Sequence, residues 1–367
     1  MVMVSCLSYM SGRFQEVREA LKGLHDVAWP RTYHVHEVPE PFREPGIITG
    51  YRSDHCSFFQ AVASVFTLNN EAMNFWTHFI PALYFAWLTT SFSTSMDLFG
   101  DPFLFPFTCY MISACGYMLL SSFAHTFSCV SLLARYVCFF FDYIGISMYS
   151  WGAALLCFSY SFPPYLMAGW VSYIFLPLAA VNTVAATFSS CLSRFCEAKG
   201  IRTLLRLGAF AVPAVWIALM LLQWVYTCFM NSGICKDTTL SLHFGHMFFL
   251  IAGATFYGSH LPECISPGSF DTMGHSHNLF HICVVLSTYH EMLAGLENLQ
   301  YRRDILETLR WSPSPAWVTH VTPCLVALNA VTVMVFTYFM HQKLNSANYS
   351  CSGDTQPKML NGHAKRT

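Results

Sequence analysis

The sequence predicts an all-α, polytopic membrane protein. The chain has 367 residues, of which 54% are hydrophobic and only 11% are Asp, Glu, Lys or Arg. Soluble proteins carry about 25% charged residues, so most of this surface cannot face water. A second observation is a series of eight apolar segments, each close to or above the about 20 residues that a spanning helix needs. The net charge of −1 gives no electrostatic basis for binding nucleic acid.

Residues 1–70 precede the first of these segments, and we expect them to form a cytoplasmic N-terminal segment. Residues 14–27 space their apolar side chains as a helix does, which predicts an amphipathic helix on the membrane surface or against the bundle. The prolines and glycines of residues 38–52 exclude a long helix there. Residues 57–66 are apolar but short, which favours an interfacial position.

The transmembrane domain is expected to cover residues 71–342, and the tail 343–367 is predicted to be disordered. Prolines at positions 81, 177 and 213 fall inside three spans, which membrane helices tolerate better than soluble ones do. The predicted spans are residues 72–94, 103–127, 136–160, 164–190, 204–230, 240–260, 277–297 and 316–341.

The distribution of Lys and Arg predicts the orientation. Positive charges gather before the first span, in the connection 191–206 and in the tail, and eight spans place all three on one side. Because short cytoplasmic loops are enriched in Lys and Arg, both termini are expected in the cytoplasm. Arg302, Arg303 and Arg310 are the exception, since they fall in an expected outer loop.

Two histidines open the seventh span. His277 and His281 are four residues apart, so a helix places their imidazoles on one face, one turn apart. One helix can supply two nitrogen ligands to a zinc ion in this way. The alternative is a pair of core or capping histidines. His290 lies nine residues beyond His281 and is expected to point away from the pair.

A third histidine is predicted at the same depth. The second span ends on the cytoplasmic side with His125, and Ser121 precedes it by one turn on the same face. Asp142 lies about two turns into the third span, among aromatic residues, where a carboxylate needs a proton, a cation or a metal. We therefore predict a zinc site formed by the two histidines of the seventh span and His125, with Asp142 nearby through a water.

Several strings of the membrane core carry a resemblance. They are NEAMNFWTHF (70–79), SSFAHTFS (121–128), FDYIGIS (141–147), GATFYGSHLPE (253–263) and PGSFDTMGHSHNLFH (267–281). With them the sequence resembles the progestin and adiponectin receptor family. The segment 38–52, the form GHSHNLFH and the eighth apolar segment look like its membrane progestin receptor branch.

The resemblance implies a seven-helix core bundle of the adiponectin-receptor type, here with an additional C-terminal helix, in the plasma membrane. It also implies an intracellular zinc site whose ligands map onto His125, His277 and His281, with the serine and aspartate of the family at Ser121 and Asp142. Hemolysin III-like proteins and, more remotely, alkaline ceramidases share this core.

Two function classes remain open on the sequence. The first is a membrane steroid receptor for rapid, non-genomic signalling, in which a progestin or another apolar lipid enters from the bilayer and a G protein is a candidate partner. The second is a zinc-dependent, ceramidase-like hydrolase of a lipid amide, in which Asp142 and Ser121 act on the substrate and its water. The resemblance favours the receptor, the site chemistry favours the hydrolase, and the zinc could instead be structural.

Three polar residues near the first span receive a structural interpretation. His78 is expected to bond with Asn74, which lies four residues earlier on the same helical face. Glu71 and Asn74 are expected to cap the first span or to bind the seventh.

Overall fold

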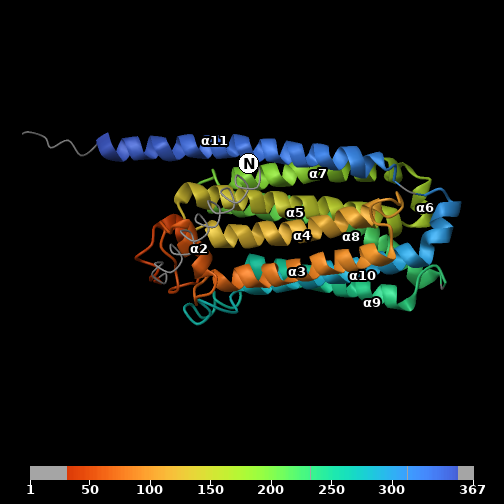
Figure 1. Cartoon of the computed structure of the whole chain (residues 1–367), viewed down its shortest axis with the longest axis horizontal. Helices are drawn as coiled ribbons and strands as arrows, with labels where there is room; N and C mark the ends of the chain where they lie inside the picture. Colours follow the sequence, from red (N-terminus) through yellow and green to blue (C-terminus); the bar gives the residue numbers. More distant parts are fainter. Residues whose placement is uncertain (1–30, 232, 312, 354–367) are drawn as a thin grey trace, which may run out of the picture.

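The structure is a computed structural model that describes residues 31–231, 233–311 and 313–353. The predicted amphipathic helix at 14–27 lies outside these residues. Within the described part, eight long helices lie side by side (Figure 1), which confirms the all-α class. They are α3 (Ala72–Ser95), α4 (Phe105–Phe127), α5 (Leu132–Tyr160), α7 (Trp170–Ser193), α8 (Lys199–Met230), α9 (Asp237–Ser259), α10 (Ser276–Thr308) and α11 (Thr322–Gly353). The short elements are η1 (Glu40–Phe42), α2 (Phe58–Ser64), α6 (Pro164–Met167) and the π-helical turn η2 (Trp317–Val321).

Seven helices of the described chain are long and apolar enough to cross a membrane, which confirms a polytopic membrane protein. They are α4, α5, α7, α8, α9, α10 and α11 with η2. The helix at the first predicted span, α3, is 24 residues long but is not among the seven. Asn74, Thr77 and His78 make its first turns polar. It still runs along the bundle beside α4, and the described chain begins and ends at the same end of the bundle (Figure 1).

The core is closed around α4, α5 and α10. A Cβ added at Gly145 would lie 2.9 Å from the Cα of Tyr117, so the glycine allows α5 to approach α4 closely. Deep in the same core, Tyr149 donates its hydroxyl to Oε2 of Glu291 over 2.7 Å, and Tyr110 shares its hydroxyl hydrogen between the carbonyl of Thr288, at 2.8 Å, and the same Oε2, at 3.2 Å. A buried carboxylate in hydrocarbon needs such donors, and these two hold α4 and α5 in a fixed register against α10.

The N-terminal segment packs against one end of the bundle, where α4 ends and α10 begins. We call this the histidine end. Arg52 donates from Nη2 to the carbonyl of His125 over 2.6 Å and from Nη1 to that of Thr126 over 2.9 Å, so it caps the last turn of α4. Asp271, just before α10, accepts hydrogen bonds from the backbone N–H groups of Ile48 and Thr49. The segment therefore joins the end of α4 to the approach to α10.

The expectation that Arg302 and Arg303 lie in an outer loop is wrong, because α10 continues to Thr308. Arg302 is fully buried and donates to the carbonyls of Tyr160, the last residue of α5, and of Phe162, just beyond it. Arg303 pairs with Asp101, with 2.7 Å between Nη2 and Oδ2. Both arginines are thus engaged by partners at this end of the bundle, Arg302 in the interior and Arg303 at the surface.

The last helix also extends beyond residue 341, where the eighth span was predicted to end, and continues to Gly353. Packing accounts for part of this extension. Leu344 packs against the apolar cluster that contains Phe336 and Met340, and the ammonium of Lys343 lies 5.6 Å above the ring of Phe195.

Candidate metal centre

Three histidines meet at the histidine end of the bundle. His125 occupies the last turn of α4, and His277 and His281 occupy the first turns of α10. The histidines of the two helices are in contact, because Nε2 of His125 lies 3.3 Å from Nε2 of His277. One ring nitrogen of each histidine lies within 4.8 Å of the other two, and the described chain offers no other group of this kind. His125 and His281 are each 2% exposed and His277 is partly buried, and the group could hold a metal ion.

The orientation of His125 is set by Glu71, which immediately precedes α3. Oε2 of Glu71 lies 2.7 Å from Nδ1 of His125, and both side chains are buried. Nδ1 therefore donates to the carboxylate, and Nε2 is left to face His277. Metal-binding histidines are commonly held by a carboxylate in this way. The spacing of residues along the chain does not reveal this contact, which the sequence reading missed.

Two residues of α3 orient His281. Its Nδ1 lies 3.1 Å from the hydroxyl of Thr77 and 3.2 Å from the carbonyl of Asn74, which leaves Nε2 free to point toward the other two histidines. The side chain of Asn74 accepts from Nδ2 of Asn278 on α10 over 2.6 Å and donates to Glu71 over 2.8 Å. The polar residues of α3 thus contact both Glu71 and the start of α10. The hydrogen bond between Asn74 and Asn278 confirms the expected contact of Asn74 with the seventh span.

The expected hydrogen bond between His78 and Asn74 is wrong, because Asn74 is engaged by its other partners. His78 instead stacks on His281, with 3.7 Å between the ring centroids and 9° between the planes. It is buried, and neither ring nitrogen has a hydrogen-bond partner among the described residues. The stacked ring of His78 therefore sterically restricts rotation of the His281 ring.

Ser121 on α4 and Asp142 on α5 lie next to each other in the vicinity of His125. Ser121 is buried one turn before the histidine, and the side chain of Asp142 lies next to it. Asp142 also interacts electrostatically with His125 and with Arg194. Asp142 is not part of the group of mutually close ligand atoms, which consists of the three histidines.

The prediction for His290 is confirmed. Its Nδ1 lies 2.8 Å from the carbonyl of Leu286, and its ring packs against Gly245 and Phe249 of α9. The ring is thus outside the three-histidine group.

Comparison of the sequence with known protein families shows which family the chain belongs to. The sequence model of the haemolysin-III-related family matches residues 66–292, more than half of the chain and all three histidines. The chain belongs to this family.

The similar proteins include membrane progestin receptors, the branch that the sequence motifs resemble. The chain is 36% identical to membrane progestin receptor gamma of Mus musculus over 301 residues, 81% of this chain and 90% of that protein. It is 37% identical to membrane progestin receptor delta of Homo sapiens over 311 residues, 84% and 90% of the two chains. With membrane progestin receptor alpha of Homo sapiens it shares 33% identity over 275 residues, 74% and 78% of the two chains. These relationships confirm the predicted family.

Proposed function

We propose that the protein is a plasma-membrane receptor for steroids of the progestin class and that it mediates rapid, non-genomic signalling. The observation that carries this proposal is the similarity to proteins named membrane progestin receptors along most of both chains. The apolar outer surface of the bundle supports it, because a steroid can reach such a protein from the lipid phase. A G protein is our candidate signalling partner, and the histidine end, which faces the cytoplasm in the proposed orientation, is the surface that it would meet.

We further propose that His125, His277 and His281 hold a zinc ion. A tetrahedral zinc with Zn–N bonds of about 2.0–2.1 Å keeps two ligand nitrogens roughly 3.3 Å apart. The two Nε2 atoms of His125 and His277 lie 3.3 Å apart, which fits this requirement. Zinc also suits the three imidazole nitrogens as ligands and the hydrogen bond that His125 makes to the carboxylate of Glu71. Ligands from both α4 and α10 would tie these helices together at the histidine end.

A zinc-dependent lipid amide hydrolase is the second candidate, and the interactions of Asp142 with Ser121 and with His125 favour it. A zinc ion held by three histidines supplies a Lewis acid that polarises a carbonyl and acidifies water. Asp142 would accept a proton from that water, and Ser121 would donate its hydroxyl to the substrate. The bilayer position suits a ceramide-like substrate, because its long chains remain in the lipid while its amide reaches the histidine end.

One preparation tests both candidates. The purified protein, reconstituted in lipid nanodiscs, is analysed for zinc by mass spectrometry, for saturable binding of tritiated progesterone, and for release of fatty acid from a ceramide. The receptor proposal expects saturable progesterone binding. Absence of such binding in a zinc-loaded, monodisperse sample contradicts the receptor proposal, and ceramide turnover without progesterone binding favours the hydrolase.

A further inference from the structure

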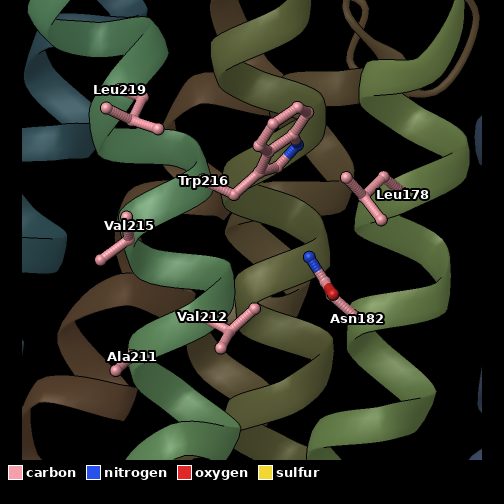
Figure 2. Close-up of a pocket in the computed structure, with 7 residues that line it drawn as sticks. All are labelled: Leu178, Asn182, Ala211, Val212, Val215, Trp216 and Leu219. Carbon is pink, nitrogen blue, oxygen red and sulfur yellow. The ribbon is translucent and has the colours of Figure 1, made fainter.

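A membrane-facing groove runs between α7 and α8, away from the histidine end (Figure 2). Its volume is about 400 Å³, within the range of about 300–1,000 Å³ of small-molecule sites. Three lining residues, Val212, Val215 and Leu219, are about half exposed, so the groove opens to the lipid. It is lined by Leu178, Asn182, Ala211, Val212, Val215, Trp216 and Leu219.

Asn182 is the only polar amide in this lining and lies near the middle of α7. Figure 2 shows its side chain extending from α7 toward α8. The amide makes no hydrogen bond with any residue that the structure describes, whereas Asn329 on α11 donates to the carbonyl of Leu325. Lipid tails offer no acceptor at this depth, and an amide without a partner in hydrocarbon is costly. The amide therefore points to an occupant that brings its own acceptor.

Trp216 supplies a flat, fixed wall beside the amide. Its indole stacks on Phe175 with 5.6 Å between centroids and 22° between planes, and its Nε1 donates to the carbonyl of Phe175 over 3.4 Å. Beyond Asn182 a second hollow of about 210 Å³ continues along the same two helices. A Cβ added at Gly208, which lines this hollow, would meet nothing within 4 Å. The groove is thus elongated, with the amide in its middle.

We propose that this groove binds the steroid that enters from the bilayer, with the rings on Trp216 and the Asn182 amide donating to a keto oxygen. The inference rests on the proposed receptor function and deepens it by naming the site. A progestin has keto oxygens, which only accept hydrogen bonds, so it complements a free N–H donor. A fatty acyl chain has no acceptor at this depth.

The test compares three variants with the parent protein in nanodiscs, using saturation binding of tritiated progesterone. Asn182→Leu removes the amide, and Ala211→Phe fills the groove. Val181→Phe is the matched control, because Val181 is 63% exposed on α7 and does not line the groove. We expect roughly tenfold weaker binding for Asn182→Leu, at least as large a loss for Ala211→Phe, and parental binding for Val181→Phe. Zinc content and the size-exclusion profile show whether each variant is folded.

The outcomes separate the site from the function. Saturable binding by the parent together with unchanged affinity in folded Asn182→Leu and Ala211→Phe overturns the site and leaves the receptor proposal intact. Absence of binding by the parent overturns both. If Asn182→Leu lowers the dimer fraction while progesterone binding stays parental, the amide joins two copies of the chain and the steroid assignment is overturned.

Discussion

Oε2 of Glu71 lies 2.7 Å from Nδ1 of His125, although 54 positions separate the two residues in the sequence. Each side chain is buried, and the carboxylate determines which nitrogen of the imidazole faces α10. A charge-assisted bond of this kind is stronger than a neutral one. It also makes the imidazole a better donor to a metal. Glu71 is therefore a positioning residue of the proposed zinc site.

The first prediction concerns this contact. Glu71→Gln keeps the size of the side chain but removes its charge, so zinc affinity should fall by about 10- to 100-fold, the usual effect of losing such a partner. The measurement is a competition titration against a chelator of known affinity. Glu297→Gln is the control, because Glu297 accepts from Thr238 and Thr239 near the opposite end of α10. Equal affinity in the Glu71 variant and the parent would show that the carboxylate does not orient a ligand.

The second prediction concerns the ligands themselves. His277→Ala removes one of three donors, so zinc per protein should fall from about one to a small fraction. His290→Ala alters the same helix outside the three-histidine group and should leave zinc content at the parental level. Metal analysis after dialysis against a weak chelator measures both. A similar loss of zinc in the two variants, or a parent protein without zinc, would mean that the three histidines are core residues and not metal ligands.

The third prediction separates receptor from enzyme through Asp142. Asp142→Asn preserves the shape of the side chain and leaves the three histidines in place, so progesterone affinity should change by no more than severalfold. It removes the proton acceptor, so any ceramide hydrolysis should fall by roughly 10²- to 10⁴-fold. Asp97→Asn, in the exposed turn after α3, is the control.

Both activities of the Asp142 variant are measured on the same nanodisc sample. A parallel loss of hydrolysis, steroid binding and signalling would mean that the protein signals through a reaction product, which contradicts the receptor proposal as stated.

The fourth prediction concerns topology. Lys and Arg gather before α3, in residues 191–206 around the connection from α7 to α8, and from residue 343 onward, so both termini should face the cytoplasm. Epitope tags inserted at positions 10 and 360 should be protected from antibody in intact cells and become accessible after permeabilisation. A control tag in the loop between α8 and α9 should be accessible in both conditions. A tail that is reached from outside, or a glycan on Asn348, rules out this arrangement.

The sequence by itself determined the class of protein and the face that carries the histidines. Length and hydropathy are properties of a local segment, so they predict where long apolar helices lie. The spacing of His277 and His281 is also local, because any helix places residues four apart on one face. His125 was found because the end of its helix has the same depth as the start of α10, and depth follows from the order of the spans.

The tertiary structure decided which neighbours these helices have and how each is rotated. The sequence placed Arg302 in a loop, yet it is buried against the end of α5, because packing extended α10 beyond its apolar stretch. The alignment of Glu71 with His125, and of Asn74 with Asn278, required α3 to settle against both α4 and α10. No local pattern encodes these contacts, because helix neighbours and rotations follow from side chains brought together from distant parts of the chain.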